Sequence, residues 1–360
     1  MQLTFLGHTG LRVSEFCLGT MTFGTDWGWG ADEATSRAVF DRYVAAGGNF
    51  FDTANAYTNG SSEAMLGKFL HGQRDRHVVA TKYTISSDKS NPNAGGNQRK
   101  SLRQSLEASL QRLNTDYIDL YWVHMWDGFT PVEETLRALD DAVRAGKILH
   151  IGLSDFPAWV VAGADTTARL SGLTRPAAIQ VEYNLGYRQA EHELIPMAQA
   201  HGLSVLDWSP LGGGALTGKM LQPASKAAQD SRVGSGAVAR ITNKYQTEQG
   251  MALVQTLVAV AQELGCTAAQ LALAWLRHKS DCHIPMLGAR SVEQIEANLA
   301  AAAVQIPPEA MARLDATGDG SLGFPLDFLR AGQQDWQGEQ LQRLDARARS
   351  QAQDLMGVRA

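Results

Sequence analysis

The sequence predicts an α/β fold: a closed (β/α)8 TIM barrel with an N-terminal β-hairpin and a helical C-terminal extension. Three observations predict it. Eight short apolar runs recur along the 360 residues, segments with a helical period separate most of them, and the runs are apolar throughout instead of alternating. Continuous apolar strands belong to a parallel sheet flanked by helices, and eight repeats favour closure into a barrel over an open sheet.

The predicted elements follow one another in a regular order. A hairpin is expected over residues 2–13, turning at residues 8–10 and plugging the bottom of the barrel. Strands are predicted at residues 17–20, 49–52, 77–81, 118–123, 150–153, 179–182, 204–207 and 283–286. Helices are predicted at residues 33–46, 99–113, 132–145, 190–200, 251–265 and 292–300. The clearest of them, 99–113, carries Leu102, Leu106 and Leu110 on one face.

Two segments fall outside this repeat. Residues 222–245 are rich in Ala and Ser and weakly patterned, which predicts a long loop. Residues 1–320 are expected to form the barrel domain, and residues 321–360 a C-terminal extension that packs on the barrel or on a neighbouring subunit.

Composition and charge exclude several classes of protein. The chain is 44% hydrophobic with no apolar run near the eighteen residues of a membrane span, and its formal charge of −5 offers no polycationic surface for nucleic acid. Three cysteines without a close pair argue against a disulfide framework, and no metal-binding spacing occurs. The first twenty residues lack the pattern of a secretory signal, so a cytoplasmic location is expected. The protein is expected to be a monomer or a homo-oligomer.

The candidate chemistry lies where the predicted strands end, because barrels react at the carboxyl ends of their strands. Asp52, Lys82 and His124 each close or directly follow an apolar run, and Tyr57 comes soon after Asp52. Taken singly, each has a structural interpretation as a helix cap, a packing residue, a solvated cation or a rim residue. The barrel, however, points all four toward one mouth.

Seven segments carry a resemblance to the aldo-keto reductase superfamily, running from about Leu3 to Ala303. They are residues 52–57, 81–82, 120–124, 152–155, 180–184, 208–211 and 288–291. Within the superfamily, residues 121–127 and 154–159 look most like the bacterial aryl-alcohol dehydrogenase-related branch.

The resemblance implies a catalytic tetrad, and the chemistry explains its residue types. Hydride transfer to a carbonyl develops negative charge on oxygen, which a proton donor must neutralise. The free phenol of tyrosine has a pKa of about 10, and a neighbouring cation lowers it. Tyr57 is therefore expected to donate the proton, with Lys82 lowering its pKa and Asp52 holding Lys82. His124 is expected to hydrogen-bond the substrate oxygen or to assist proton transfer, depending on the direction of the reaction.

The resemblance also implies that NADP(H) lies across the mouth. Ser154, Asp155 and Gln180 would bind the carboxamide, with Asp155 at a position where many relatives carry Asn, and Trp208 would stack on the nicotinamide. Arg290 favours NADP(H) over NAD(H), because a guanidinium binds a 2′-phosphate with two hydrogen bonds. The full predicted cofactor set is Gly19, Thr20, Met21, Asp52, Ser154, Asp155, Gln180, Trp208, Ser209, Pro210, Leu211, Gly214, Lys219, Gly288, Ala289, Arg290, Gln294 and Asn298.

Aromatic residues near the strand ends suggest a pocket for an aryl aldehyde or a bulky ketone. The predicted substrate residues are Phe23, Trp27, Tyr83, Met125 and Trp126. Two alternatives stay open at this point. One is an NADPH-binding, redox-sensing partner subunit with little turnover, and the other is a barrel isomerase or hydrolase that needs no nicotinamide.

Overall fold

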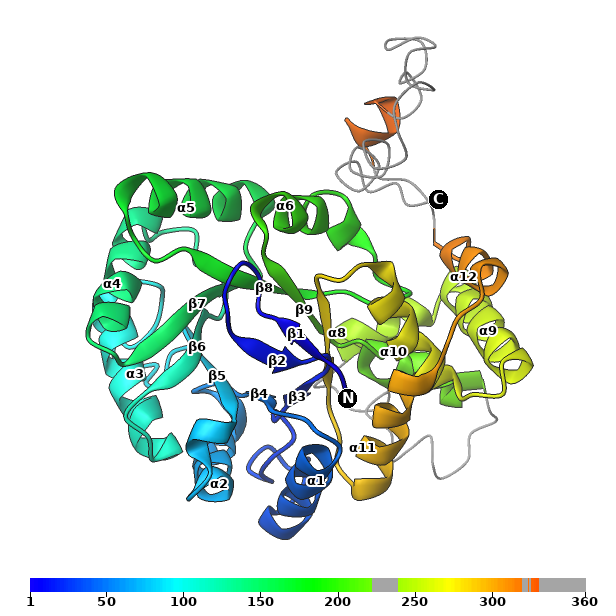
Figure 1. Ribbon diagram of the computed structural model, residues 1–360, viewed down its shortest axis with the longest axis horizontal. Coiled ribbons are helices and arrows are strands. Elements are labelled where there is room, and N and C mark those ends of the chain that lie inside the picture. Colours follow the sequence, from blue (N-terminus) through cyan, green and yellow to red (C-terminus); the bar gives the residue numbers. More distant parts are fainter. Residues whose placement is uncertain (222–238, 319–322, 324, 330–360) are drawn as a thin grey trace. The chain divides into compact units, whose positions relative to one another are not determined.

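Eight strands close into a barrel in the computed structural model, which describes residues 1–221, 239–318, 323 and 325–329 (Figure 1). The order around the barrel is β10-β3-β4-β5-β6-β7-β8-β9, and neighbouring strands run parallel. The strands are β3 (Cys17–Gly19), β4 (Phe50–Asp52), β5 (Val78–Tyr83), β6 (Ile118–Val123), β7 (Ile148–Ser154), β8 (Pro176–Glu182), β9 (Ser204–Trp208) and β10 (His283–Leu287). Each overlaps its predicted run, so the (β/α)8 prediction is confirmed.

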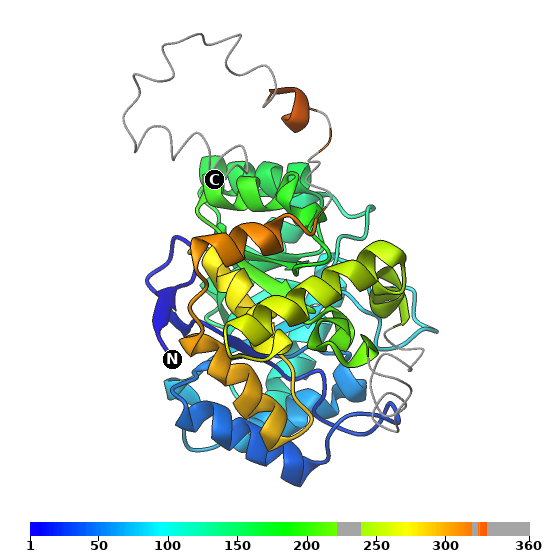
Figure 2. The same ribbon diagram turned by 90° about the vertical axis from the view of Figure 1, so that its right-hand side faces the viewer.

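The N-terminal hairpin closes one end of this barrel. Strands β1 (Leu3–Phe5) and β2 (Arg12–Ser14) pair antiparallel. Leu6 and Val13 are fully buried in the same apolar cluster as Phe50, Leu120 and Ile284 of the barrel interior. The side view in Figure 2 places the hairpin at one end of the barrel. The predicted plug is therefore confirmed.

Six predicted helices are present with small shifts at their ends. They are α1 (Glu33–Ala45), α3 (Arg99–Leu113), α4 (Val132–Arg144), α6 (Leu194–His201), α9 (Glu248–Glu263) and α11 (Val292–Leu299). The prediction did not place α2 (Ser61–Leu70), α5 (Ala158–Ser171), α10 (Ala268–Lys279) or α12 (Pro308–Asp315).

Helices α2 and α10 lack an apolar stripe that runs along the whole helix with a polar face opposite it. Helix α2 buries Leu66, Phe69 and Leu70 in its second half, but Ser62, Glu63 and Gly67 share the buried face. Gly67 is needed there, because a Cβ would lie 2.6 Å from the carbonyl oxygen of Leu113 in α3. In α10 every residue from 271 to 276 is buried, so no polar face marks the period.

The described residues divide into two compact units. The first holds the barrel and comprises Met1–Val181, Leu203–Trp208 and His283–Ala303; the second comprises the intervening and following segments. Within the second unit, α10 packs against α9 and α12 also contacts α9. None of the helices in the described ranges is by itself long and apolar enough to span a membrane, and one pair, α9 with α10, passes that test only together, with a 94° bend.

The prediction of a long loop over residues 222–245 is wrong for its last seven residues, 239–245. Residues 239–242 form the short helix α8 (Ala239–Thr242), followed by a helical turn, Asn243–Tyr245. Tyr245 is buried and donates to Asn184 Oδ1 at 2.6 Å, which fixes this turn. Residues 222–238 lie outside the described part, as does nearly all of the predicted extension at 321–360.

Candidate functional site

The carboxyl ends of β4 and β5 bring Asp52 and Lys82 together, as predicted. Both side chains are fully buried and form an ion pair. The Lys82 ammonium also donates to the carbonyl oxygen of Thr53 at 2.9 Å and to the Tyr57 hydroxyl at 3.3 Å. Gln180, on β8, donates its amide N–H to the other carboxylate oxygen of Asp52 at 3.1 Å. One buried carboxylate therefore aligns the cation that contacts the phenol.

His124 lies next to Tyr57. It follows β6 directly, and its ring meets the Tyr57 ring edge to face with centroids 5.9 Å apart. Its backbone N–H donates to the carbonyl of Tyr83 at 3.1 Å, while its buried Nδ1 has no hydrogen-bond partner among the described residues. Burial, with a smaller effect from the Lys82 charge, lowers the pKa of His124 to about 3. The imidazole is therefore neutral at physiological pH.

The pKa of the Tyr57 phenol differs from the expectation that Lys82 lowers it. Burial raises the pKa of the phenol above its usual value, and the Lys82 charge lowers it only in part. The prediction that Lys82 brings the pKa of Tyr57 below its ordinary value is thus wrong for the net effect. Burial opposes the charged form of Lys82 as well, but Asp52 outweighs it and holds the pKa of Lys82 high. Tyr57 carries its proton at neutral pH, as a proton donor must.

The loop that presents Tyr57 is held in an unusual backbone conformation. Thr58, Asn59 and Gly60 have positive φ angles of 46°, 55° and 95°. For residues with a Cβ this left-handed region costs about 1 kcal/mol each, so surrounding contacts must hold it. Thr58 supplies two: its hydroxyl donates to the carbonyl of Phe23 at 2.8 Å and accepts from the Ser62 N–H at 3.0 Å.

A pair of hydrogen bonds fixes the predicted carboxamide residues. The Trp208 indole N–H donates to Asp155 Oδ1 at 3.0 Å, and the Ser154 hydroxyl donates to Asp155 Oδ2 at 3.2 Å. Asp155 is exposed and has a φ of 54°, whereas Ser154 is buried. The Asp155 charge also acts on Tyr57 and raises the pKa of the phenol further. These residues therefore belong to the same end of the barrel as the tetrad.

The segment after β10 contains the predicted phosphate ligand Arg290. Gly288 is exposed, with open space where a Cβ would lie. The Arg290 backbone N–H donates to Gln294 Oε1 at 2.8 Å, and Ser291 caps the N-terminus of α11 directly after it. Asn298 is buried and donates to the Gly288 carbonyl at 3.3 Å, so its side chain supports the segment.

Two further predicted cofactor residues are buried, as Ser154 and Gln180 are. Thr20 is fully buried, with its hydroxyl donating to the Asp52 carbonyl at 3.0 Å, and Ala289 is 2% exposed. Gly19 and Met21, beside Thr20, are half-buried. The structure thus gives Thr20 a structural place between β3 and β4.

The remaining predicted cofactor residues lie in the second unit, in the segment after Trp208. The turn Gly212–Thr217 contains left-handed backbone at Gly213 and Gly214, with φ of 66° and 103°. The N–H of Gly214 donates to the Leu211 carbonyl at 2.9 Å, and that of Gly212 to the Ser209 carbonyl at 2.8 Å. Pro210 is buried, and Lys219 is exposed.

The predicted substrate residues separate into two groups. Trp27, Met125 and Trp126 are exposed by 37%, 39% and 37%, and the Trp27 ring meets Tyr57 edge to face at 6.4 Å. Phe23 and Tyr83 are fully buried, against the expectation that they line a pocket. Tyr83 stacks on Tyr121 at 5.4 Å, because alternate residues of a strand face opposite sides and Lys82 faces the interior.

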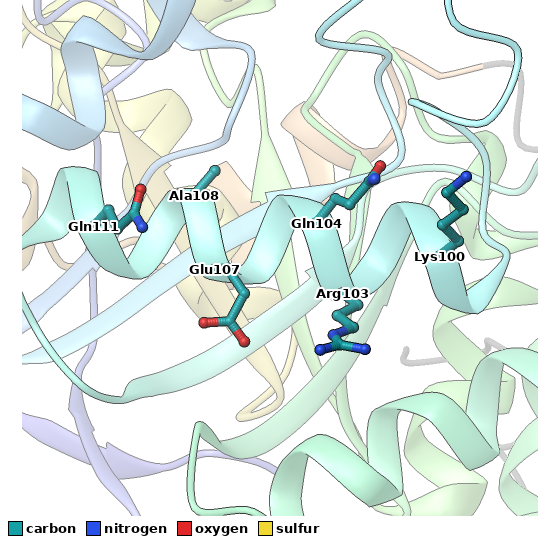
Figure 3. A pocket seen from close by; sticks show the side chains of 6 residues that line it. All are labelled: Lys100, Arg103, Gln104, Glu107, Ala108 and Gln111. Carbon is teal, nitrogen blue, oxygen red and sulfur yellow. The ribbon is translucent and has the colours of Figure 1, made fainter.

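One surface depression lies away from this site. A shallow depression runs along the outer face of α3, where Lys100, Arg103, Gln104, Glu107, Ala108 and Gln111 line it (Figure 3). These side chains belong to the helical layer, not to the strand ends that carry the tetrad. Within the described ranges, no group of three His, Cys, Asp or Glu side chains is arranged to hold a metal ion.

Comparisons with known proteins agree with this geometry. Residues 15–319 match the aldo/keto reductase family, and the chain belongs to that family of oxidoreductases. It is 42% identical to the norsolorinic acid reductase stcV of Emericella nidulans over 330 residues, covering 89% of this chain and 82% of the relative. It is 35% identical to the aryl-alcohol dehydrogenase [NADP(+)] of Phanerodontia chrysosporium over 335 residues, covering 88% and 85%.

The buried neutral His124 predicts a pH dependence of stability. In the unfolded chain a histidine has a pKa of about 6.5, whereas burial lowers that of folded His124 to about 3. The unfolded state therefore binds a proton first, and stability falls as pH drops from about 6.5 toward 3. We expect His124→Asn to reduce the slope of the unfolding free energy between pH 6.5 and 4.5, measured by urea denaturation. The same change at the exposed His71 should leave that slope intact; equal slopes for wild type and His124→Asn would contradict the assignment.

Proposed function

We propose that this chain is an NADPH-dependent aldo-keto reductase that reversibly reduces aldehydes or ketones, with aromatic or bulky carbonyls as its substrates and Tyr57 as the general acid. The observation that supports it most is the contact of the Lys82 ammonium with the Tyr57 hydroxyl beside a neutral His124. A protonated phenol, a neutral hydrogen-bond donor and a paired cation are the groups that carbonyl reduction requires.

The residues of the barrel unit fit a nicotinamide dinucleotide. Gln180 uses its amide N–H on Asp52, which leaves its amide oxygen as an acceptor suited to a carboxamide NH2. The indole of Trp208 is held at its edge by Asp155, which leaves the ring face as the stacking surface. Arg290 stands directly before the N-terminus of α11, where the guanidinium and the helix dipole both favour a phosphate. These features support NADP(H) over NAD(H).

The chain's own residues then have defined tasks. When bound, NADPH supplies a hydride to the carbonyl carbon. Tyr57 donates its hydroxyl proton to the carbonyl oxygen, and the charge of Lys82 stabilises the phenolate that remains until solvent returns a proton. His124 donates a hydrogen bond from Nε2 to the same oxygen and orients the carbonyl. In the direction of alcohol oxidation, Tyr57 accepts the proton.

The substrate class is supported by the aromatic residues around the phenol. Trp27 meets Tyr57 edge to face. Trp126, in the loop after β6, meets Trp159, in the first turn of α5, edge to face at 5.9 Å. Flat apolar surfaces of this kind favour an aryl group. The relative named as an aryl-alcohol dehydrogenase supports an aromatic substrate.

The test combines binding with turnover. We expect NADPH to quench tryptophan fluorescence at lower concentration than NADH, and 4-nitrobenzaldehyde to be reduced with consumption of NADPH. Tyr57→Phe should keep NADPH affinity and lose about 10²–10⁴-fold in kcat, because general acid catalysis contributes that much. Tight NADPH binding without turnover of a panel of aldehydes would favour a redox-sensing subunit. Absence of NADPH binding would favour an isomerase or hydrolase and overturn the proposal.

A further inference from the structure

Ser62 lies at the start of α2, where its hydroxyl meets two neighbouring strand ends. Its oxygen is 2.9 Å from the Thr20 hydroxyl after β3 and 2.9 Å from the Thr53 hydroxyl after β4. It also donates to the carbonyl oxygen of Thr20 at 2.7 Å. Ser62, Thr20 and Thr53 are all fully buried. One hydroxyl thus ties together two loops that belong to different repeats of the barrel.

Each loop tied by Ser62 carries a group used by the tetrad. The carbonyl oxygen of Thr53 accepts the second hydrogen bond of the Lys82 ammonium, at 2.9 Å. Thr20 donates from its N–H and its hydroxyl to the carbonyl of Asp52, at 2.8 and 3.0 Å. The main chain of Asp52 and Thr53 is therefore held by a network centred on one serine.

Ser62 is also joined to the loop of Tyr57. Its backbone N–H donates to the hydroxyl of Thr58, the first of three consecutive residues with positive φ. The left-handed turn follows Tyr57 directly, so the strained backbone and the network share an anchor on α2.

The next residue of α2 makes the corresponding contact with β5. Glu63 is fully buried, accepts from the Thr81 hydroxyl at 2.6 Å and pairs with Arg112 at 2.6 Å. Thr81 precedes Lys82. The first turn of α2 therefore holds β3 and β4 through Ser62 and β5 through Glu63, next to the residues that carry the reaction.

We propose that Ser62 is a positioning residue of the reductase site, whose hydroxyl network sets the place of the Thr53 main chain, and so of the Lys82 ammonium relative to the Tyr57 hydroxyl. The inference rests on the proposed function, since it assigns Ser62 an effect on Tyr57 as proton donor. Ser62 itself, being fully buried, touches neither substrate nor cofactor.

The variant Ser62→Ala removes the hydroxyl and keeps the helix. Small misplacements of reacting groups cost up to about 100-fold in rate, so we expect kcat to fall about 10- to 100-fold and KM for 4-nitrobenzaldehyde to change less than about twofold. With Lys82 less well placed, its lowering effect on the pKa of Tyr57 weakens. The basic limb of the pH profile of kcat should therefore move to higher pH, which a loss of stability alone does not produce.

Matched variants separate positioning from folding. Ser61→Ala, one residue earlier on the same helix, should leave kcat and the basic limb unchanged, and Ser62→Thr, which keeps a hydroxyl, should recover activity. If Ser62→Ala fails to fold, the isosteric Thr53→Val breaks the same Ser62–Thr53 contact and should reproduce the fall in kcat and the shifted limb. If a folded Ser62→Ala or Thr53→Val protein keeps the wild-type kcat and the wild-type position of the basic limb, Ser62 is not a positioning residue.

A readout without turnover distinguishes this failure from failure of the proposed function. The phenol of Tyr57 can be titrated by phenolate absorbance as the difference between proteins with and without Tyr57→Phe. We expect this titration to occur at higher pH in Ser62→Ala than in wild type. A protein that reduces no aldehyde but shows the shift refutes the function and keeps the positioning role, whereas an active enzyme without the shift refutes the positioning role alone.

Discussion

Lys82→Met should abolish most of the carbonyl reduction and lower the stability of the fold, which makes it the variant with the largest expected effect. The Lys82 ammonium contacts Asp52, the Thr53 carbonyl and Tyr57, and methionine keeps the length of the chain without the charge. Without that charge, nothing in this contact stabilises the phenolate left after proton transfer. We expect kcat/KM to fall by about 10³-fold or more, in line with the loss of an electrostatic group in a buried site.

The stability cost follows from the carboxylate left behind. Removing one partner of a buried ion pair costs about 3–5 kcal/mol, which urea unfolding at pH 7 measures. Burial already raises the pKa of Asp52, and the loss of Lys82 raises it further. A carboxyl with a raised folded pKa is favoured at low pH, so the deficit of Lys82→Met should shrink as pH falls, and Asp52→Asn in the same chain should recover part of it.

Lys68→Met is the matched control for this prediction. Lys68 also forms an ion pair, with Glu33 at 2.8 Å, but its side chain is 63% exposed. Exposed pairs contribute about 0–1 kcal/mol, so this change should leave activity and stability close to wild type. A Lys82→Met protein that unfolds like Lys68→Met and still reduces aldehydes would contradict both the buried pair and its role.

The sequence predicted the place of the strand-end residues better than that of the aromatic residues. Asp52, Lys82 and His124 were predictable as a group because each ends a continuous apolar run, and strand ends in a barrel converge. Tyr83 was expected in the pocket because it lies near the end of a strand. It is the last residue of β5, and the side chains of a strand alternate between the interior and the helices, so Tyr83 and Lys82 face opposite sides. Phe23 packs against Phe69 of α2, with ring centroids 6.0 Å apart. No local sequence pattern marks this contact, because the two residues are far apart in the sequence.

The serine and threonine network of the site was not predictable in the same way. Thr20 and Thr53 precede Ser62 by 42 and 9 residues, and the three hydroxyls meet only because β3, β4 and α2 are set side by side. The available signal was Ser61–Ser62–Glu63, which has the composition of a helix start. That pattern marks where α2 begins; it does not say which strands its first turn holds.

Gly152→Ala should destabilise the barrel beneath the tetrad. Gly152, on β7, is paired in register with Trp122 on β6. A Cβ at position 152 would lie 2.3 Å from the Cε3 and Cζ3 atoms of Trp122, whose side chain is fully buried. Overpacking of this kind costs about 1–3 kcal/mol. We expect the urea midpoint and the melting temperature of Gly152→Ala to fall accordingly.

The same variant should reduce activity, because Trp122 lies next to the buried carboxylate. The indole of Trp122 has the smallest of the effects that lower the pKa of Asp52, after Lys82 and Gln180, and its Nε1 makes no hydrogen bond to the described residues. Displacing the ring by the added methyl disturbs the partner that aligns Lys82. The expected result is a lower kcat at temperatures where the protein remains folded, with NADPH affinity close to wild type.

Two further variants decide whether the clash with Trp122 is the cause. Combining Gly152→Ala with Trp122→Leu makes room for the methyl, so the two changes should be coupled, with the double variant more stable than the sum of the single effects. Gly163→Ala is the matched control: Gly163 lies within α5 with nothing within 4 Å of a Cβ, so the change should stabilise the helix by about 0.5–1 kcal/mol. Additive effects at positions 152 and 122 would show that the missing Cβ of Gly152 does not serve to seat the indole.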